Sequence, residues 1–120
     1  MQNILIVDDV QTDRELLGSV VSHAGHHPIY ASDGSQAVEV AKQTQPALIF
    51  LDVVMPVQDG YKTCRLLKKD PDTATIPVVM VTSKNADSDR FWSQKQGAVD
   101  QVGKPFTPDN LLHCIRMYAR

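Results

Sequence analysis

Four side chains that could bind a metal or a phosphate directly follow apolar runs of the sequence: Asp8, Asp9, Asp52 and Lys104. Carboxylates that are held close together repel one another, so a proton or a divalent cation must neutralise them. Oxygen ligands without Cys or His nearby favour Mg²⁺ over a transition metal. If the apolar runs bring these side chains into one pocket, the pattern predicts a magnesium site that suits phosphoryl chemistry.

Apolar runs that alternate with helical periods must position these side chains. Five short runs are predicted strands: 3–7, 28–31, 47–51, 77–82 and 98–102. Apolar residues at helical spacing follow each run, in segments around 16–24, 37–41, 61–67, 86–96 and after 107. Thr107 is the expected N-cap of the last helix, and Pro108 its first residue. Five βα units in a row predict a parallel sheet with helices on both faces.

The residues of each strand indicate its place in the sheet. Three runs are apolar on both faces and belong in the centre: 3–7, 47–51 and 77–82. Pro28 in the second strand, and Asp100 and Gln101 in the fifth, suit the sheet edges. The order 2-1-3-4-5 follows, which defines a doubly wound, flavodoxin-like α/β fold. Such sheets bind ligands between strands 1 and 3, where Asp9 and Asp52 are expected.

Composition limits the class of protein. The chain has 120 residues, of which 42% are hydrophobic and 22% charged, as in globular proteins with one core. A net charge of −2 provides no basic field for nucleic acid or an acidic membrane. We therefore expect a single cytoplasmic domain over 1–120, without an output domain, a charged leader or a membrane span. Cys64 and Cys114 lie in amphipathic helical patterns and are expected to be buried, reduced thiols.

Four short motifs have the order and spacing of a known family: Ile-Val-Asp-Asp at 6–9, Asp52-x-x-Met55-Pro56-x-x-x-Gly60, Val81-Thr82 and Lys104-Pro105-Phe106. Each motif stands at the end of a different predicted strand. Together they resemble the CheY-like receiver domain of two-component response regulators, and the resemblance covers the whole chain. It implies a signalling module and not a metabolic enzyme, one that assists its own phosphoryl transfer and slowly dephosphorylates itself.

The resemblance implies a role for each acidic residue. Asp52 matches the phosphoacceptor, which attacks a phosphohistidine of a sensor histidine kinase and becomes an acyl phosphate. Asp9 matches the carboxylate that binds Mg²⁺ directly, and Asp8 the one that acts largely through water. The backbone carbonyl of Val54 matches the third protein ligand.

The remaining motif residues imply how a bound phosphoryl group is sensed. Lys104 matches the lysine that pairs with the phosphoryl group, and Pro105 implies a cis peptide bond after it. Thr82 matches the hydroxyl that moves towards the phosphoryl group. Gln101 departs from the family, which often has Tyr or Phe three residues before the lysine. The output signal is therefore expected to depend more on the loop 82–86 and the helix after it.

In the receiver family that this sequence resembles, two further positions tend to govern access of the water that removes the phosphoryl group. They lie two residues after the acceptor and two after the switch hydroxyl, and here they are Val54 and Lys84. An apolar side chain and a long cation differ from a pair that could orient water. We therefore expect slow self-dephosphorylation.

The resemblance also implies an output surface and partners. The surface consists of the helix at 86–96, the strand at 98–102 and the last helix. Phe91 and Trp92 lie in the first of these; we expect one to pack in the core, and an exposed aromatic there would be a candidate for partner contact. The expected partners are a CheA-like or hybrid histidine kinase and a downstream protein. The stretches 81–84, 91–92 and 96–98 are similar to regulators of type IV pilus twitching or phototaxis, which points to motility machinery.

Each site residue alone has a simpler interpretation. Asp8 and Asp9 could cap the first helix, Asp52 could be a turn residue, Lys104 a solvated surface lysine and Thr82 an ordinary strand residue. Chance poorly explains why such residues occupy the carboxyl ends of four strands, so the receiver interpretation is strongly favoured.

Other functions are weighed against this one. An Asp-nucleophile phosphatase of the haloacid dehalogenase type needs a second acid two residues after the attacking Asp, but residue 10 is Val. A flavin carrier needs a phosphate-binding loop after the first strand, where Asp8 and Asp9 would repel phosphate. A receiver that only drains a kinase, as a phosphate sink, stays open. The sequence also leaves open a monomer or a phosphorylation-dependent dimer.

Overall fold

The computed structural model describes residues 2–53, 59–83 and 87–119. Strands and helices alternate within these residues: β1 (Asn3–Val7), α1 (Gln11–His23), β2 (His27–Ala31), α2 (Gly34–Thr44), β3 (Leu48–Asp52), α3 (Gly60–Lys69), β4 (Val78–Thr82), α4 (Asp87–Lys95), β5 (Asp100–Gly103) and α5 (Pro108–Tyr118). All neighbouring strands are parallel, in the order β2-β1-β3-β4-β5. The predicted doubly wound fold and strand order are confirmed.

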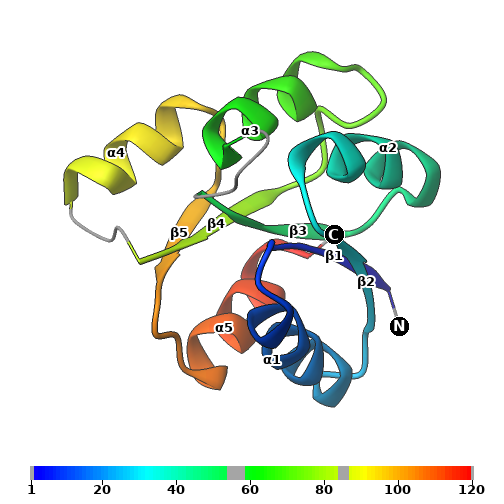
Figure 1. Ribbon diagram of the computed structural model, residues 1–120, viewed down its shortest axis with the longest axis vertical. Coiled ribbons are helices and arrows are strands. Elements are labelled where there is room, and N and C mark those ends of the chain that lie inside the picture. The colour runs from blue at the N-terminus through cyan, green and yellow to red at the C-terminus, as the bar shows by residue number, and fades with distance from the viewer. Residues whose placement is uncertain (1, 54–58, 84–86, 120) are drawn as a thin grey trace.

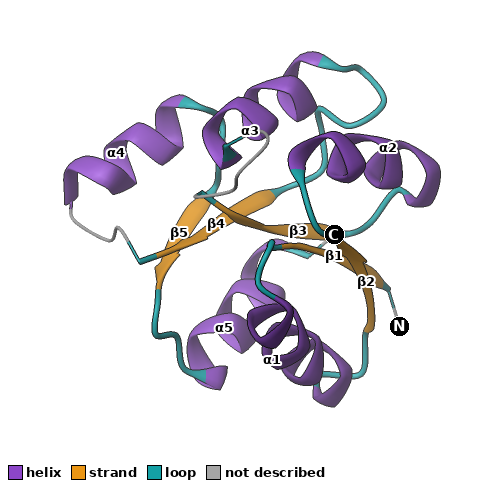
Figure 2. Cartoon of the chain, in the orientation of Figure 1, coloured by secondary structure: helices purple, strands orange, loops and turns teal. Residues whose placement is uncertain are grey.

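The sheet separates two hydrophobic cores. Helices α1 and α5 cover one face, and α2, α3 and α4 cover the other (Figure 1). The strands form the middle layer between these helices (Figure 2). Successive side chains of a strand point to opposite faces, so Leu5 packs with the α2–α3 side and Ile6 with the α1–α5 side. The central strands are buried on both faces, which is why they are almost entirely apolar.

The last strand begins later than its sequence indicates. Residues 98–102 are the predicted strand, but β5 starts at Asp100. Gly97 has φ 99°, its N–H donates to the Gln94 carbonyl at 2.9 Å, and the Ala98 N–H donates to the Ser93 carbonyl at 3.2 Å. These two bonds close α4 with a left-handed glycine turn, so Ala98 belongs to the helix cap.

Local capping signals position the last helix as predicted. Thr107 is the N-cap of α5, and Pro108 is its first residue. The Thr107 hydroxyl accepts a bond from the Asn110 N–H, and the Asn110 side chain accepts one from the Thr107 N–H. This reciprocal pair satisfies backbone donors at the helix start.

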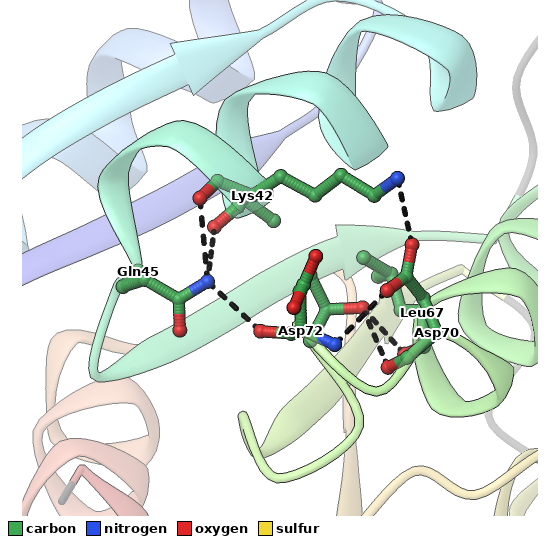
Figure 3. Close-up of polar contacts among 7 residues, drawn as sticks. Lys42, Gln45, Leu67, Asp70 and Asp72 are labelled. Carbon is green, nitrogen blue, oxygen red and sulfur yellow. Dashed lines mark hydrogen bonds and ion pairs between the residues drawn. The ribbon is translucent and has the colours of Figure 1, made fainter.

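Polar contacts join α2 to the segment after α3, at the end of the sheet opposite to the strand carboxyl ends. The Lys42 ammonium lies 2.8 Å from the Asp70 carboxylate, and the Gln45 amide donates to the Asp72 carbonyl at 2.8 Å (Figure 3). The Thr73 hydroxyl donates to the Leu67 carbonyl at 2.6 Å. These bonds fix the route from α3 into β4 without contributing to the site.

Within the described part of the chain, no helix is both long enough and apolar enough to span a membrane.

Both cysteines are free and buried, as expected. Cys64 packs in the core on the α2–α3 side and Cys114 in the core on the α1–α5 side. Burial raises the pKa of each thiol to about 11.

We predict that both thiols resist alkylation in the folded protein. At pH 8 a pKa of about 11 leaves roughly one thiol in a thousand ionised, and the thiolate is the reactive form. Both should react rapidly once urea unfolds the chain. Mass spectrometry after timed iodoacetamide treatment measures this, and rapid modification of folded protein at either cysteine would contradict the buried, protonated assignment.

Candidate functional site

The carboxyl ends of β1 and β3 bring three aspartates together. Val7 pairs with Leu51 in the sheet, so the next residues, Asp8 and Asp52, leave the two strands side by side. Asp8 is fully buried and Asp52 is 6% exposed, whereas Asp9 is exposed to solvent. One carboxylate oxygen from each of the three aspartates lies within 4.8 Å of the others.

This group of oxygens fits a small divalent cation. Mg²⁺ binds oxygen ligands at about 2.1 Å, so ligands on opposite sides of the ion lie about 4.2 Å apart. The three oxygens lie within 4.8 Å of one another, which is close to that separation. Among the residues that the structure describes, the His, Cys, Asp and Glu side chains that converge here offer carboxylate oxygens, which suit Mg²⁺ better than a transition metal.

Lys104 points from the end of β5 into the same cluster. Its ammonium lies 2.9 Å from an Asp8 oxygen and 3.8 Å from an Asp52 oxygen. The side chain is 19% exposed, so it is not the solvated surface lysine of the simpler interpretation. The peptide bond from Lys104 to Pro105 is cis, as the sequence resemblance implies.

The environment of Lys104 favours its charged form. Burial alone would lower the pKa of the ammonium, but hydrogen bonds to Asp8 and Asp13 and the charge of Asp52 outweigh burial. The pKa of Lys104 therefore lies above its ordinary value. One ammonium still faces more carboxylates than it can neutralise, so the pocket favours an additional cation.

A fourth carboxylate in this cluster was missed by the sequence analysis. Asp13, in the first turn of α1, lies 3.0 Å from the Lys104 ammonium. The sequence does show an acidic residue at the start of the helix after β1, which could have marked Asp13 as a candidate site residue. Its contact with Lys104 could not be inferred, because the two residues are 91 positions apart and the contact depends on side-chain reach.

Asp8 is held by contacts on both its side chain and its backbone. Its carboxylate accepts a hydrogen bond from the Val10 N–H at 2.9 Å, and its carbonyl accepts one from the Arg14 guanidinium at 2.6 Å. The N-cap of α1 is Val10, so the simpler interpretation, that Asp8 or Asp9 caps this helix, does not hold.

Gly60 brings the start of α3 against the acceptor strand. Its N–H donates to the Val53 carbonyl at 2.8 Å. A Cβ at position 60 would lie 2.1 Å from the Asp52 carbonyl oxygen, so the close approach requires glycine. Asp52 is the last residue of β3 and buried, and not a turn residue. Val54, whose carbonyl is the expected third metal ligand, lies outside the described residues.

Thr82 ends β4 at the same edge of the sheet. It is fully buried, it pairs with Gly103 of β5, and its carbonyl accepts a hydrogen bond from the Lys104 N–H at 2.8 Å. Thr82 and Lys104 are thus mechanically connected through the backbone. Lys84 lies outside the described residues.

Both aromatic side chains of α4 are exposed, although one of them was expected in the core. Phe91 is 58% and Trp92 50% exposed, so the prediction that one of them packs in the core is wrong. Ser93 of α4 and Gln96, the residue after this helix, are buried instead. Gln101, at the position where the family often has an aromatic, is buried and contacts the Ser93 hydroxyl through its side-chain oxygen.

The chain matches the response regulator receiver domain family over residues 4–116. Protein PilH of Pseudomonas aeruginosa is 38% identical over 115 residues, which are 96% of this chain and 95% of PilH. A probable transcriptional regulator ycf27 of Porphyridium aerugineum is 37% identical over 119 residues. That alignment covers 99% of this chain but 48% of the regulator.

Solved structures with the same fold include a chemotaxis protein and the receiver domain of a histidine kinase. The chemotaxis protein CheY4 of Vibrio cholerae superposes with a TM-score of 0.92 at 26% identity, over 98% of each chain. The receiver domain of the sensor histidine kinase PA1611 from Pseudomonas aeruginosa, with a magnesium ion coordinated in its active site cleft, superposes with a TM-score of 0.90 at 25% identity. This match covers 98% of the present chain and 97% of the PA1611 domain. With the family match over nearly the whole sequence and the relationship to PilH, the chain belongs to the response regulator receiver family of two-component signalling.

Proposed function

We propose that this chain accepts a phosphoryl group on Asp52 and signals by protein contact. The observation that carries the proposal is the position of Asp52. It ends β3 in a buried pocket, within 4.8 Å of oxygens from Asp8 and Asp9, and 3.8 Å from the Lys104 ammonium. An acid at a strand end, next to an ammonium and to carboxylates that would hold a divalent cation, is suited to carry a phosphoryl group.

Asp8, Asp9 and Asp52 are the residues that would hold Mg²⁺. The convergence of their oxygens supports this assignment, as does the magnesium in the PA1611 receiver domain. The bound ion supplies positive charge that neutralises the phosphoryl oxygens during transfer. Asp9 is exposed, so it can take up the ion from solvent, whereas Asp8 is fixed by its contacts with Val10 and Arg14.

Asp52 acts as the nucleophile in the proposed reaction. One of its carboxylate oxygens bonds to phosphorus while the phosphorus–nitrogen bond of a phosphohistidine breaks. The electron pair of that bond stays on the imidazole nitrogen of the donor. Lys104 pairs with the transferred group from the β5 side.

The proposed output surface comprises α4, β5 and α5. Phe91 and Trp92 expose large aromatic area on it, and such side chains are frequent anchors of protein interfaces. Thr82 lies at the site, and residues 83–86 separate it from α4. Gln101 and Ser93 join β5 to α4 by a buried polar contact, so a hydrogen-bond change there takes the place of aromatic rotation.

PilH and CheY4 support a stand-alone role in a chemotaxis-like pathway. The chain matches 95% of the length of PilH, and CheY4 is named as a chemotaxis protein. The proposed partners of this chain, which we place in the cytoplasm, are a sensor histidine kinase, CheA-like or hybrid, and a protein of the motility machinery. Slow self-dephosphorylation remains part of the proposal.

We predict that acetyl phosphate with Mg²⁺ adds one phosphoryl group to the native chain and none to Asp52→Asn. Asn lacks the anionic oxygen that attacks phosphorus. Intact-mass spectrometry measures the addition. Asp72→Asn, which removes an exposed carboxylate at the opposite end of the sheet, is the control and should be phosphorylated normally. Phosphorylation of Asp52→Asn to the native level would refute the acceptor assignment.

Without Mg²⁺, Asp52→Asn should stabilise the folded chain by about 1 kcal/mol, because it removes a buried negative charge from a cluster with excess carboxylates. Saturating Mg²⁺ should stabilise the native chain by about 2–3 kcal/mol at a hundredfold excess over its dissociation constant, and the variant by less. Urea unfolding in chelator and in Mg²⁺ measures both effects. Equal stabilisation of the two chains by Mg²⁺ would contradict the assignment of Asp52 as a metal ligand.

Beryllofluoride, a phosphoryl mimic, should change the fluorescence of Trp92 in the presence of Mg²⁺. Trp92 is the single tryptophan of the chain and lies exposed on α4, so its emission reports movement of that helix. Thr82→Ala should bind the mimic but show a smaller change, because it lacks the hydroxyl that we propose moves towards the phosphoryl group. An unchanged spectrum in the native chain at saturating mimic would favour the phosphate sink over the messenger.

A further inference from the structure

Asp13 is the carboxylate of this pocket to which the proposed phosphoryl transfer gives no role. It projects from the first turn of α1 and accepts a hydrogen bond from the Lys104 ammonium at 3.0 Å. Its side chain is 32% exposed, so it is more accessible than Asp8 or Asp52. Lys104 is therefore shared between α1 and the strand ends before any phosphoryl group arrives.

The hydrogen bonds of the Lys104 ammonium are directed mainly away from the acceptor. An ammonium has three N–H donors. Two of them reach Asp8 and Asp13 at hydrogen-bond distance, whereas the nearest Asp52 oxygen lies at 3.8 Å, beyond hydrogen-bond length. The lysine therefore directs two of its three N–H donors to carboxylates that are not the acceptor.

Asp13 would still compete for the Lys104 ammonium when a cation and a phosphoryl group occupy the site. Among the described residues, the oxygens that converge for a cation belong to Asp8, Asp9 and Asp52, and Asp13 lies outside this group. The charge of Asp8 is therefore balanced in the loaded site, while that of Asp13 is not. A phosphoryl group on Asp52 would compete with Asp13 for the same ammonium and would be repelled by the Asp13 carboxylate.

We propose that Asp13 is a positioning residue that holds Lys104 as a competing counterion and so weakens retention of a phosphoryl group on Asp52. The inference rests on the proposed function, because it requires phosphoryl binding at Asp52. In the unphosphorylated chain the Asp13 contact stabilises the lysine away from the acceptor. In the phosphorylated chain the lysine leaves Asp13 for the phosphoryl oxygens, and part of the binding free energy is spent on breaking that contact.

The expected size of the effect follows from the exposure of Asp13. Ion pairs that are partly open to solvent contribute little, so removing this competitor should strengthen binding of a phosphoryl mimic by about two- to fivefold. Salt screens such a contact, because the Debye length shortens to about 3 Å at 1 M ionic strength. The gain should therefore shrink as salt rises.

The test is a beryllofluoride titration at saturating Mg²⁺, followed by fluorine NMR of the bound mimic, on native chain, Asp13→Asn, Asp13→Glu and Asp109→Asn. Asp109 is the exposed acid in the first turn of α5. Its substitution removes the same charge and the same favourable interaction with a helix dipole, without touching Lys104. Asp13→Glu keeps the charge within reach of the lysine. The prediction is tighter binding in Asp13→Asn at low salt, and native affinity in the other two variants.

Equal affinity of Asp13→Asn and native chain, or weaker binding by Asp13→Asn, would overturn the inference while leaving the acceptor assignment intact. An equal gain in Asp109→Asn would also overturn it, because the effect would then come from net charge. A native chain that binds no mimic at all would overturn the proposed function, and this inference with it. A gain in Asp13→Asn that persists undiminished at 1 M salt would show a packing effect and not a competing charge.

Discussion

Repulsion between carboxylates at the ends of two adjacent parallel strands is the constraint on which this structure depends. Asp8 and Asp52 are buried side by side, and Asp9 adds a third charge within reach. Burying like charges is unfavourable unless cations stand between them. Lys104 supplies one such charge from β5, and the remaining excess of negative charge makes the pocket suited to a divalent cation.

The rest of the fold serves to hold that charge arrangement in place. Parallel pairing of β1 with β3, and of β4 with β5, brings the four strand ends to one edge of the sheet. Gly60 allows α3 to start directly against the Asp52 carbonyl, and Arg14 anchors the Asp8 backbone from α1. Because the cores on both faces bury the central strands almost completely, and β1 pairs with β3, the backbone holds Asp8 and Asp52 side by side. A bound divalent cation would reduce their repulsion.

The sequence predicted the strand order and the convergence of Asp8, Asp52 and Lys104, because both depend on backbone topology and strand ends. It could not predict features that depend on side-chain reach or on helix rotation. Asp13 contacts Lys104 across 91 positions of sequence, and nothing in the local spacing marks that pair. The prediction that Phe91 or Trp92 packs in the core was wrong because the polar Ser93 and Gln96 are buried there, against the usual tendency of a helix to bury its large apolar residues. Ala98 was assigned to β5 because its apolar character hides its role in the glycine-terminated cap of α4.

The polar contact between Gln101 and Ser93 gives this receiver a different coupling between β5 and α4 from one built on an aromatic side chain. The proposed output surface therefore combines this buried polar contact with the exposed aromatic side chains Phe91 and Trp92. The central claim is that a cation and a phosphoryl group share the pocket formed by Asp8, Asp9 and Asp52. A crystal structure of the chain with saturating Mg²⁺ and beryllofluoride tests it most directly. The account predicts a magnesium ion bound by Asp9 and Asp52 and a beryllofluoride on Asp52 in contact with Lys104. A pocket that contains neither under those conditions would contradict it.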